Sequence, residues 1–403
     1  MIVDIGPGSQ SSLREANTAR VINAVEKYGP ITQVEISAAT GLSPASVSNT
    51  VKRLAAEGFF KTENTIRSGR RAQLVSIPRQ SGLLAGISVG HRSLTVAVAT
   101  TSFEILQVKN LPLPVDHRPD TTLDRAALLT HDLVSAVGVP DDLAGVGITV
   151  PAPVDPATGK VPVKGIFPGW EGIDIAGALS RRLDRPAAIE NDANAGALAE
   201  SKLGALRGVT NGIFLRASYS TGAGIMFGDR ILHGAGGTAG EIGHVQVDPT
   251  GLICRCGARG CLNTVVGADV LVESLRLSRG YSSLSDVIRE ANSGDAGCRQ
   301  VIADAGASIG VAVADLATNF APSVVVVGGE LATTGDLILD PIRDALDSRP
   351  LLAGSVAVRL ADLAPQAELY GALVKARDII GTAPPGTPPR GAPTGTTTRR
   401  KEA

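Results

Sequence analysis

Three cysteines and one histidine stand close together in a chain that uses both residue types sparingly. His244 is followed by Cys254, Cys256 and Cys261, and these are three of the four cysteines among 403 residues. One imidazole and three thiolates make a closed tetrahedral ligand set that suits Zn²⁺ and leaves no open position for a catalytic water. The spacing therefore predicts a structural zinc site at these four residues. The alternative is a group of reduced cysteines without metal.

The surroundings of this cluster agree with an intracellular metal site. Gly251, Gly257 and Gly260 are expected to let the chain turn tightly around the ion, and Cys298 is expected to be an ordinary small buried residue. Four cysteines, three of them clustered, do not form a disulfide framework.

The N-terminus has neither a basic start nor an apolar signal core, and no run of about eighteen apolar residues occurs. We expect a cytoplasmic protein without a membrane span.

A second group of residues has the types and spacing of a DNA-binding surface. ITQVEISAATGLSPASVSNTVKRLAAEGFF indicates two helices joined by a tight turn, in which Gly41 ends the first helix and Ser43 and Pro44 begin the second. One face of the second helix is expected to be buried through Val47, Val51 and Leu54. The other face presents small polar and basic side chains that are expected to contact DNA: Ser46, Ser48, Asn49, Lys52 and Arg53.

The flanking segments complete this motif. Residues 14–29 have helical spacing, with four side chains able to share one face: Val21, Ile22, Val25 and Tyr28. After Gly58, the β-like runs FFKTEN and AQLVSI are joined by TIRSGRR, whose arginines would contact phosphates or a minor groove: Arg67, Arg70 and Arg71. Helices followed by a basic hairpin predict a winged helix-turn-helix. The alternative is a small helical protein-interaction module.

Charge and composition divide the chain into parts. Residues 11–80 carry ten Lys and Arg against five Asp and Glu, whereas residues 81–380 carry 24 against 32. A basic head on an acidic body indicates that the head alone contacts a polyanion. The predicted domains are a DNA-binding head over 12–80 and an effector and dimerisation body over 81–380. A tail over 381–403, rich in Pro, Gly and Thr, is expected to be disordered.

The body alternates strand-like and helix-like segments. LLAGISVG, TVAVAT and FEILQVKNL look like three consecutive strands, and DLAGVGITV, AAIEN, NGIFLRAS, GAGIMFG and SVVVVGG look like five more. Helical patterns between them indicate an α/β protein with mixed sheets. Two β-rich starts, near residues 83 and 212, predict two lobes of similar plan.

Several blocks resemble the ROK family of repressors and sugar kinases. TAGEIGHVQVDPTGLICRCGARGCLN is similar to the zinc-site signature of that family, and GITVPAPVDPATGKV, FPGW and IENDANAGALAE resemble its other blocks, in the expected order. The resemblance covers about residues 14–380. It implies an N-terminal winged helix-turn-helix followed by an α/β two-lobed body of the sugar kinase, Hsp70 and actin type (ribonuclease H-like).

The resemblance also implies a sugar site. Asp192 matches the catalytic base of the family's kinases, and Asn191, Glu241 and His244 match sugar-contacting positions. Asn263 stands where the family has an acidic sugar contact, so the amide changes that part of the ligand site. For Asp192 taken alone, a helix N-cap is the alternative reading.

The nucleotide side departs from the kinases of the family. Their Asp-x-Gly-Gly-Thr turn is matched here by Ser88-Val89-Gly90-His91-Arg92, and TGAGIMFG is expected to place Met226 and Phe227 where kinases usually carry glycines. Side chains at such positions would block the close approach of backbone to phosphate. No ATP and no catalytic residue are expected.

The predicted function is a sugar-responsive transcription regulator, most simply a repressor of carbohydrate metabolism genes. Its expected partners are a double-stranded DNA operator with an inverted repeat, a sugar or sugar derivative, and further copies of the chain in a homodimer or tetramer. Two alternatives stay open: an ATP-dependent sugar kinase with a DNA-binding appendage, and a regulator controlled by a protein partner.

Overall fold

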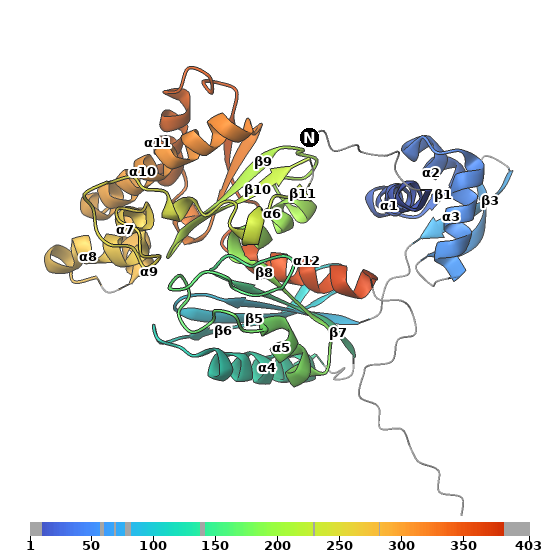
Figure 1. The fold of residues 1–403 in the computed structure, drawn as a ribbon, viewed down its shortest axis with the longest axis horizontal. Helices are drawn as coiled ribbons and strands as arrows, with labels where there is room; N and C mark the ends of the chain where they lie inside the picture. The colour runs from blue at the N-terminus through green and yellow to red at the C-terminus, as the bar shows by residue number, and fades with distance from the viewer. Residues whose placement is uncertain are drawn as a thin grey trace, which may run out of the picture. The chain divides into compact units, whose positions relative to one another are not determined.

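The structure is a computed structural model that describes residues 10–56, 60–67, 70–76, 82–137, 142–228, 230–281 and 283–382. The predicted tail therefore lies outside the described residues from position 383 onward. The chain divides into a small unit that contains the residues up to Ser81 and a large unit, Gly82–Ile380 (Figure 1). The two units are described in turn as the head and the body.

The head contains three helices and a three-stranded sheet of order β1-β3-β2. Its elements are α1 (Gln10–Tyr28), β1 (Ile31–Thr32), α2 (Gln33–Thr40), α3 (Pro44–Ala56), β2 (Lys61–Arg67) and β3 (Arg70–Ser76). Gly41 ends α2 in the left-handed conformation, and the Ser43 hydroxyl accepts a hydrogen bond from the Ser46 amide at 3.2 Å. The predicted turn of the helix-turn-helix is therefore confirmed in both its end signal and its start signal.

The core of the head forms where these helices meet. Val47, Val51 and Leu54 of α3 are buried, as predicted, together with Val21 and Val25 of α1. Tyr28, at the last position of α1, is 55% exposed, so the helix face predicted to hold it with Val21 and Val25 is buried only in part. The hairpin is also longer than predicted, since most of TIRSGRR belongs to the strands rather than to their connection. β1 was not predicted; two residues become a strand only by pairing with β3.

The body contains two five-stranded sheets with the same plan, which confirms the predicted two-lobed fold. In each sheet three antiparallel strands are followed by two parallel ones, in the orders β6-β5-β4-β7-β8 and β11-β10-β9-β12-β13. The first sheet consists of β4 (Leu83–Val89), β5 (Ser93–Thr100), β6 (Ile105–Pro112), β7 (Leu143–Val150) and β8 (Ala187–Asn191). The second consists of β9 (Gly212–Ala217), β10 (Thr221–Phe227), β11 (Arg230–Ile231), β12 (Val324–Gly328) and β13 (Ala357–Leu360).

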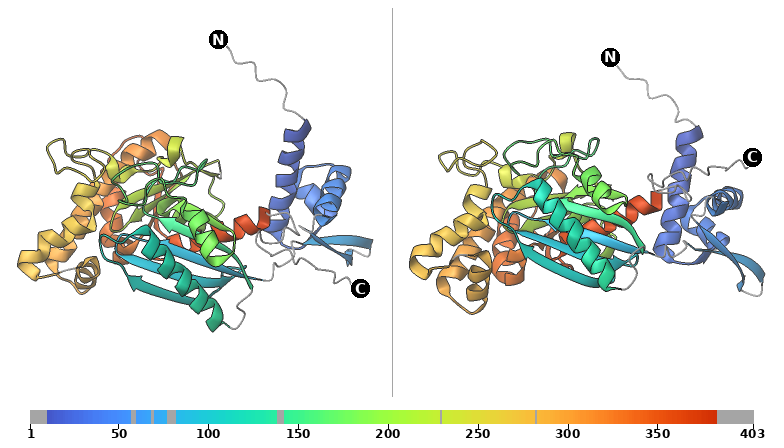
Figure 2. Two further views of the ribbon diagram at one scale, coloured as in Figure 1. Left: turned by 60° about the horizontal axis from the view of Figure 1, so that its bottom comes forward. Right: turned by 90° about the horizontal axis from the view of Figure 1, so that it is seen from below.

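Helices cover both faces of each sheet, which explains the nearly continuous apolar runs of the strands. α4 (Pro119–Ala136) and α5 (Ile175–Leu183) pack on the outer face of the first sheet, as Figure 2 shows for α4. α6 (Asp192–Leu203) and α12 (Ala367–Thr382) contribute side chains to the cores of both sheets, between the two lobes (Figure 1).

The outer face of the second sheet carries the remaining helices. These are α7 (Asn263–Val266), α8 (Ala268–Arg279), α9 (Leu284–Asn292), α10 (Ala296–Phe320) and α11 (Asp336–Asp347). Three short 3₁₀ turns complete the described helices of the body: η2 (Ala235–Gly237), η3 (Ile242–His244) and η4 (Glu330–Thr334). Among the described residues only α10 is long and apolar enough to cross a membrane, but half of its most apolar stretch is buried in this core. Cys298 lies there fully buried, as predicted.

Candidate functional site

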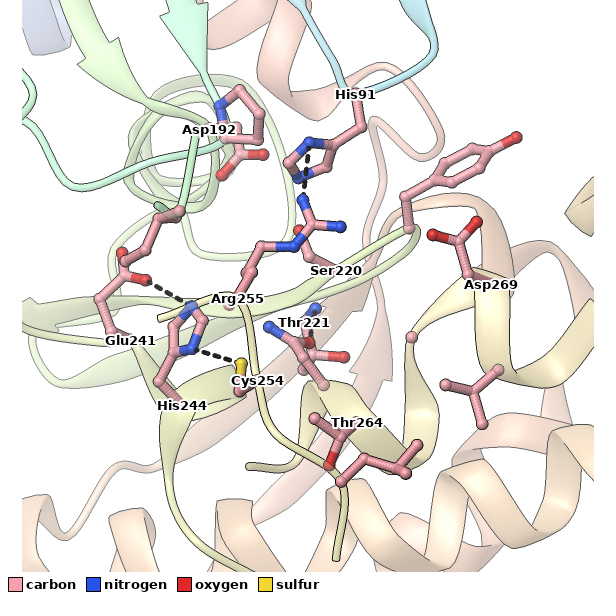
Figure 3. Close-up of a pocket in the computed structure, with 18 of the residues that line it drawn as sticks. His91, Asp192, Ser220, Thr221, Glu241, His244, Cys254, Arg255, Thr264 and Asp269 are labelled. Atoms are coloured by element: carbon pink, nitrogen blue, oxygen red, sulfur yellow. Dashed lines mark hydrogen bonds and ion pairs between the residues drawn. The ribbon is translucent and has the colours of Figure 1, made fainter. Parts of the chain in front are cut away.

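The five residues predicted to bind a sugar line one pocket of the body. Its volume is about 310 Å³, at the lower end of the range for small-molecule sites. Asn191 and Asp192 come from the junction of β8 and α6, Glu241 precedes η3 and His244 ends it, and Asn263 begins α7. The turn between β9 and β10, the start of α8 and the loop that carries Cys254 and Arg255 also contribute to the walls (Figure 3).

Asp192 is buried and held on both carboxylate oxygens. Its Oδ1 accepts a hydrogen bond from the Ala193 amide at 2.7 Å, and its Oδ2 lies 3.3 Å from Nε of Arg216. The same Nε donates to Oε1 of Glu368 at 2.5 Å, and Arg216 Nη1 donates to the carbonyl of Ser220. Burial raises the pKa of Asp192, against the charge of Arg216, which lowers it. Asp192 can still accept a ligand hydroxyl through its remaining lone pairs.

Asn191 and Asn263 both line the pocket, and both use their amides on the backbone. Asn191 is the N-cap of α6: its Oδ1 accepts from the Asn194 amide and its Nδ2 donates to the Ala152 carbonyl, each at 3.0 Å. The helix cap is therefore Asn191, not Asp192, which is the first residue of the helix. Oδ1 of Asn263 accepts from the Thr221 amide at 2.8 Å. Both amides thus hold pocket walls in place.

The two ring nitrogens of His244 face different partners. Nδ1 lies 3.5 Å from Sγ of Cys254, whereas Nε2 lies 4.0 Å from Oε2 of Glu241 (Figure 3). One ring therefore joins the cysteine cluster to the pocket. Burial, and then the negative charge of Asp192, raise the pKa of Glu241 to about 8.

His244, Cys254, Cys256 and Cys261 come together as predicted. Their ligand atoms all lie within 4.8 Å of one another, and the Sγ atoms of Cys256 and Cys261 are 3.7 Å apart. A tetrahedral zinc ion, with bonds of about 2.3 Å to sulfur and about 2.0 Å to nitrogen, needs ligand separations of about 3.5–3.8 Å. The observed spacings of 3.5 Å and 3.7 Å fit this geometry.

Glycines allow the loop of the cluster to fold back on itself. Gly257 and Gly260 have φ values of 92° and 67°, and a Cβ on Gly260 would lie 1.5 Å from the Asp248 carbonyl oxygen. Gly251 is not among the glycines with positive φ. The tight turn therefore depends on two of the three predicted glycines.

The turn between β4 and β5 carries His91 and Arg92 to the mouth of the pocket. Arg92 forms an ion pair with Asp269 of α8 at 3.0 Å, which joins the two lobes. Nδ1 of His91 accepts a hydrogen bond from Nη1 of Arg255 at 3.4 Å. Burial, and then the charge of Arg255, lower the pKa of His91 to about 3, so the imidazole is neutral and Nδ1 is free to accept.

The predicted placement of Met226 and Phe227 in a phosphate loop is wrong. Thr221 pairs with Ala217 at the tip of the β9–β10 hairpin, whereas Met226 pairs with Gly212 at its other end. Five residues of strand separate the two ends, about 17 Å. Met226 is buried in the core and Phe227 is 56% exposed. The tip that borders the pocket consists of Tyr219, Ser220 and Thr221.

A second pocket, of about 380 Å³, adjoins the first. The two share His91, Tyr219, Arg255 and Asp269 in their walls. The outer wall of the second pocket is aromatic, because Phe167 stacks on Trp170 with 4.8 Å between ring centroids. The cleft is therefore longer than the predicted sugar site.

The predicted DNA-contacting residues of α3 differ in their exposure and in whether they contact other parts of the head. Asn49 and Lys52 are exposed, and Ser46 and Ser48 are half-buried. Arg53 is exposed too, but its Nη2 donates to Oγ1 of Thr18 on α1 at 2.8 Å, so it also fastens α3 to α1. The backbones of Arg67, Arg70 and Arg71 lie at the tip of the β2–β3 hairpin, and their side chains lie outside the described part of the structure.

Sequence reasoning missed Arg216, Glu368 and Arg255. Arg216 could have been noticed, because it is a single charged residue inside the apolar run GIFLRA of β9. Glu368 is 152 positions away from its partner, and nothing local to it indicates the contact. Arg255 stands between two predicted metal ligands, Cys254 and Cys256, and nothing in that spacing assigns the arginine a role of its own.

Comparison with known families identifies the body. The model of the ROK family matches residues 84–378. The chain belongs to the ROK family. The model of the MarR family matches residues 15–71, and the head is accordingly a winged helix-turn-helix of the MarR type. The predicted order of a DNA-binding type of head before a ROK body is confirmed.

Relatives of similar length match this chain along most of its sequence. The DNA-binding transcriptional dual regulator NagC of Escherichia coli (strain K12) is 28% identical over 367 residues, which cover 86% of this chain and 90% of NagC. The xylose repressor of Bacillus subtilis (strain 168) is 26% identical over 348 residues, which cover 84% of this chain and 88% of the repressor.

Solved structures include both regulators and kinases of the ROK family. A ROK family transcriptional regulator described as a homologue of the E. coli MLC protein matches with a TM-score of 0.75 over 92% of this chain and 97% of its own, at 24% identity, and shows the fold. A ROK family glucokinase from Streptomyces griseus, in complex with glucose and AMPPNP, matches with a TM-score of 0.65 over 74% of this chain and 100% of its own, at 28% identity.

Proposed function

We propose that this ROK protein is a cytoplasmic, DNA-binding transcription repressor of carbohydrate metabolism genes, and that a sugar or sugar derivative bound in the body controls it. The observation that carries the proposal is the pairing of a MarR-type head with a ROK body, in a chain that matches nearly the full length of relatives named as a transcriptional dual regulator and a repressor. The convergence of Asp192, Glu241 and His244 in one pocket supports the sugar-binding part.

The DNA side of the proposal rests on α3. Its exposed face offers Asn49 and Lys52, with Ser46 and Ser48 beside them, and these would contact base edges in a major groove. Arg67, Arg70 and Arg71 at the hairpin tip would contact phosphates. A single small head buries too little surface for tight specific binding, so a dimer that reads an inverted repeat is proposed.

Zinc would have a structural role. Nδ1 of His244 and the thiolates of Cys254, Cys256 and Cys261 would hold the ion, and the bound ion would fix the loop against the pocket. His244 would then present Nε2 toward Glu241 and the ligand. The metal would thus stabilise one wall of the sugar site without taking part in chemistry.

The same geometry supports a regulator rather than a kinase. Asp192 does not decide between the two, because its carboxylate can hold a ligand hydroxyl in either kind of protein, so the distinction rests on the turn after β4. His91 and Arg92 occupy the turn at which a kinase needs glycine and bind Arg255 and Asp269 instead. ATP-dependent phosphorylation of glucose, xylose or N-acetylglucosamine should be at background. Robust turnover that Asp192→Asn abolishes would contradict this.

The experiment that tests the function uses the full-length, zinc-loaded chain. Selection from a random-sequence DNA duplex pool should enrich an inverted repeat with half-sites about one or two helical turns apart. Thermal shift against a panel of sugars and sugar phosphates should find a stabilising ligand, because a ligand that binds only the folded state raises the midpoint. That ligand should weaken binding to the selected DNA.

Two variants separate the two activities. Lys52→Ala should weaken DNA binding about tenfold and leave the ligand-induced thermal shift intact. Asp192→Ala should abolish the thermal shift and leave DNA binding intact. Enrichment of no sequence by the wild-type chain, or equal DNA binding with and without every stabilising ligand, would contradict the proposal.

A further inference from the structure

Arg255 lies where the two pockets of the cleft meet. Its side chain lines both pockets and runs from the cysteine loop toward His91, with Asp192 and His244 on one side and Asp269 on the other (Figure 3). Any molecule that extends from the predicted sugar site toward the second pocket would pass this guanidinium.

The cation of Arg255 is not neutralised by the described part of the protein. Arg216 is paired with Asp192 and Glu368, and Arg92 is paired with Asp269. No carboxylate of a described residue forms an ion pair with Arg255, and the partner that it has, His91, is neutral. The guanidinium therefore keeps donors and a full charge that can be offered to a ligand.

The backbone that carries Arg255 is firmly positioned. The carbonyl oxygen of Arg255 packs against Gly165, where a Cβ would lie 2.6 Å from that oxygen. Cys254 and Cys256, on either side, belong to the metal-ligand cluster. A side chain held at its base in this way loses less freedom when it binds an anion.

A hydroxyl with no partner lies in the same pocket wall. Oγ1 of Thr221 is buried and has no hydrogen-bond partner among the described residues. Ser220, beside it, also borders the pocket. Ser220 can donate its hydroxyl to an oxygen atom of a ligand, and rotation about χ1 would let Thr221 do the same. His91 in its neutral form can supply one further donor at its other nitrogen.

We propose that Arg255, with Thr221 and His91 beside it, forms an anion subsite, and that the effector is an anionic sugar carrying a phosphate or a carboxylate. This inference rests on the proposed function, because it extends the sugar site of Asp192, Glu241 and His244. The sugar ring binds at those three residues, and its anionic group binds Arg255 at the border with the second pocket. A neutral sugar leaves the guanidinium without a partner.

Isothermal titration calorimetry on the full-length, zinc-loaded chain tests this subsite. The probes are glucose, glucose 6-phosphate, glucuronate, N-acetylglucosamine and N-acetylglucosamine 6-phosphate. At least one anionic probe should bind about 10- to 100-fold more tightly than its neutral parent, the contribution expected of a charge-assisted hydrogen bond. The phosphates and glucuronate together distinguish which anion is preferred.

Arg255→Gln should remove this preference, and Arg259→Gln should leave it unchanged. Arg259 is the matched control because it lies in the same loop, outside both pockets, and donates to the Gly251 carbonyl. Zinc content, measured for each variant, must equal that of the wild type, so that a disordered loop is not mistaken for a lost contact.

The outcomes distinguish this inference from the proposed function. If neutral parents bind as tightly as their anionic derivatives, or Arg255→Gln keeps the preference, the anion subsite is wrong and the sugar sensor stands. If no probe binds the wild type, both the subsite and the sugar-binding part of the proposed function are overturned.

Discussion

Nε of Arg216 lies 3.3 Å from Oδ2 of Asp192, below the pocket and away from solvent. Asp192 follows β8 of the first sheet and Arg216 is the next-to-last residue of β9 of the second, so this ion pair joins the two lobes at the floor of the cleft. Glu368 of α12 holds the other side of the same guanidinium. A buried cation thus balances carboxylates that would otherwise repel one another.

Removal of that cation should destabilise the body strongly. Arg216→Met would leave Asp192 and Glu368 buried without a counter-ion, and we expect a loss of about 3–5 kcal/mol in the free energy of unfolding. Urea denaturation of the full-length chain measures the loss. Adding Glu368→Gln to Arg216→Met should restore part of it, because one uncompensated charge is then removed. Losses that simply add in the double variant would show that the two residues are not coupled.

The sequence predicts the fold well where the strands are apolar and long. SVVVVGG and LLAGISVG stand out as buried strands, and both are strands in the structure. β11, with two residues, and β13, with mostly exposed ones, have no apolar pattern and exist through pairing with β10 and β12. Edge strands of this kind are defined by tertiary contacts, which one sequence does not reveal.

In the site, too, local features can be predicted from the sequence and long-range ones cannot. The cysteine cluster can be predicted because its ligands lie within one loop. The position of Met226 cannot be predicted, because it depends on where the β9–β10 hairpin turns, and a strand pattern alone does not locate that turn. The partner of Arg216 is equally hidden, since Glu368 comes from a helix near the end of the body. Long-range ion pairs need the assembled fold.

The cysteine cluster yields a prediction about metal content. Purified wild-type chain should contain about one zinc ion per chain, as a closed His-Cys₃ set requires. Cys254→Ser should lower the zinc content to background and weaken sugar binding, because His244 borders both sites. Elemental analysis and calorimetry measure the two effects. Cys298→Ser, at a buried cysteine of α10, is the matched control and should keep its zinc. Full zinc retention by Cys254→Ser would exclude the Cys254 thiol as a ligand.

Asn263 allows a test of whether a pocket residue binds the ligand or supports the wall. Its Oδ1 accepts from the Thr221 amide, so Asn263→Ala should leave a buried donor unpaired and cost about 1–3 kcal/mol of stability. Asn263→Asp keeps an acceptor at that place and should cost much less. Chemical denaturation compares the two variants. Equal stability of the alanine variant and the wild type, with weaker sugar binding, would instead indicate a direct ligand contact.

Glu190 connects three separate parts of the body. It lies on β8, and its Oε2 is 3.1 Å from Nε2 of His233 and 3.2 Å from Nζ of Lys375 on α12. Burial alone would raise its pKa, but the hydrogen bond from His233 and the charge of Lys375 outweigh burial, and the pKa of Glu190 is lowered. The ionised form is therefore favoured in the folded protein.

The lowered pKa of Glu190 determines how its contribution to the free energy of unfolding changes with pH. The unfolded chain takes up the proton first, near the ordinary glutamate value of about 4.3, so the contribution of Glu190 is fully present above that pH. It is lost as the pH falls through the folded-state value. Glu190→Gln should therefore cost about 1–3 kcal/mol at pH 7, and the difference from the wild type should shrink below about pH 4.5. Urea denaturation at pH 7, 5 and 4 measures it, with Glu104→Gln at an exposed glutamate as the matched control. A difference that grows on acidification would show that Glu190 is protonated in the folded protein.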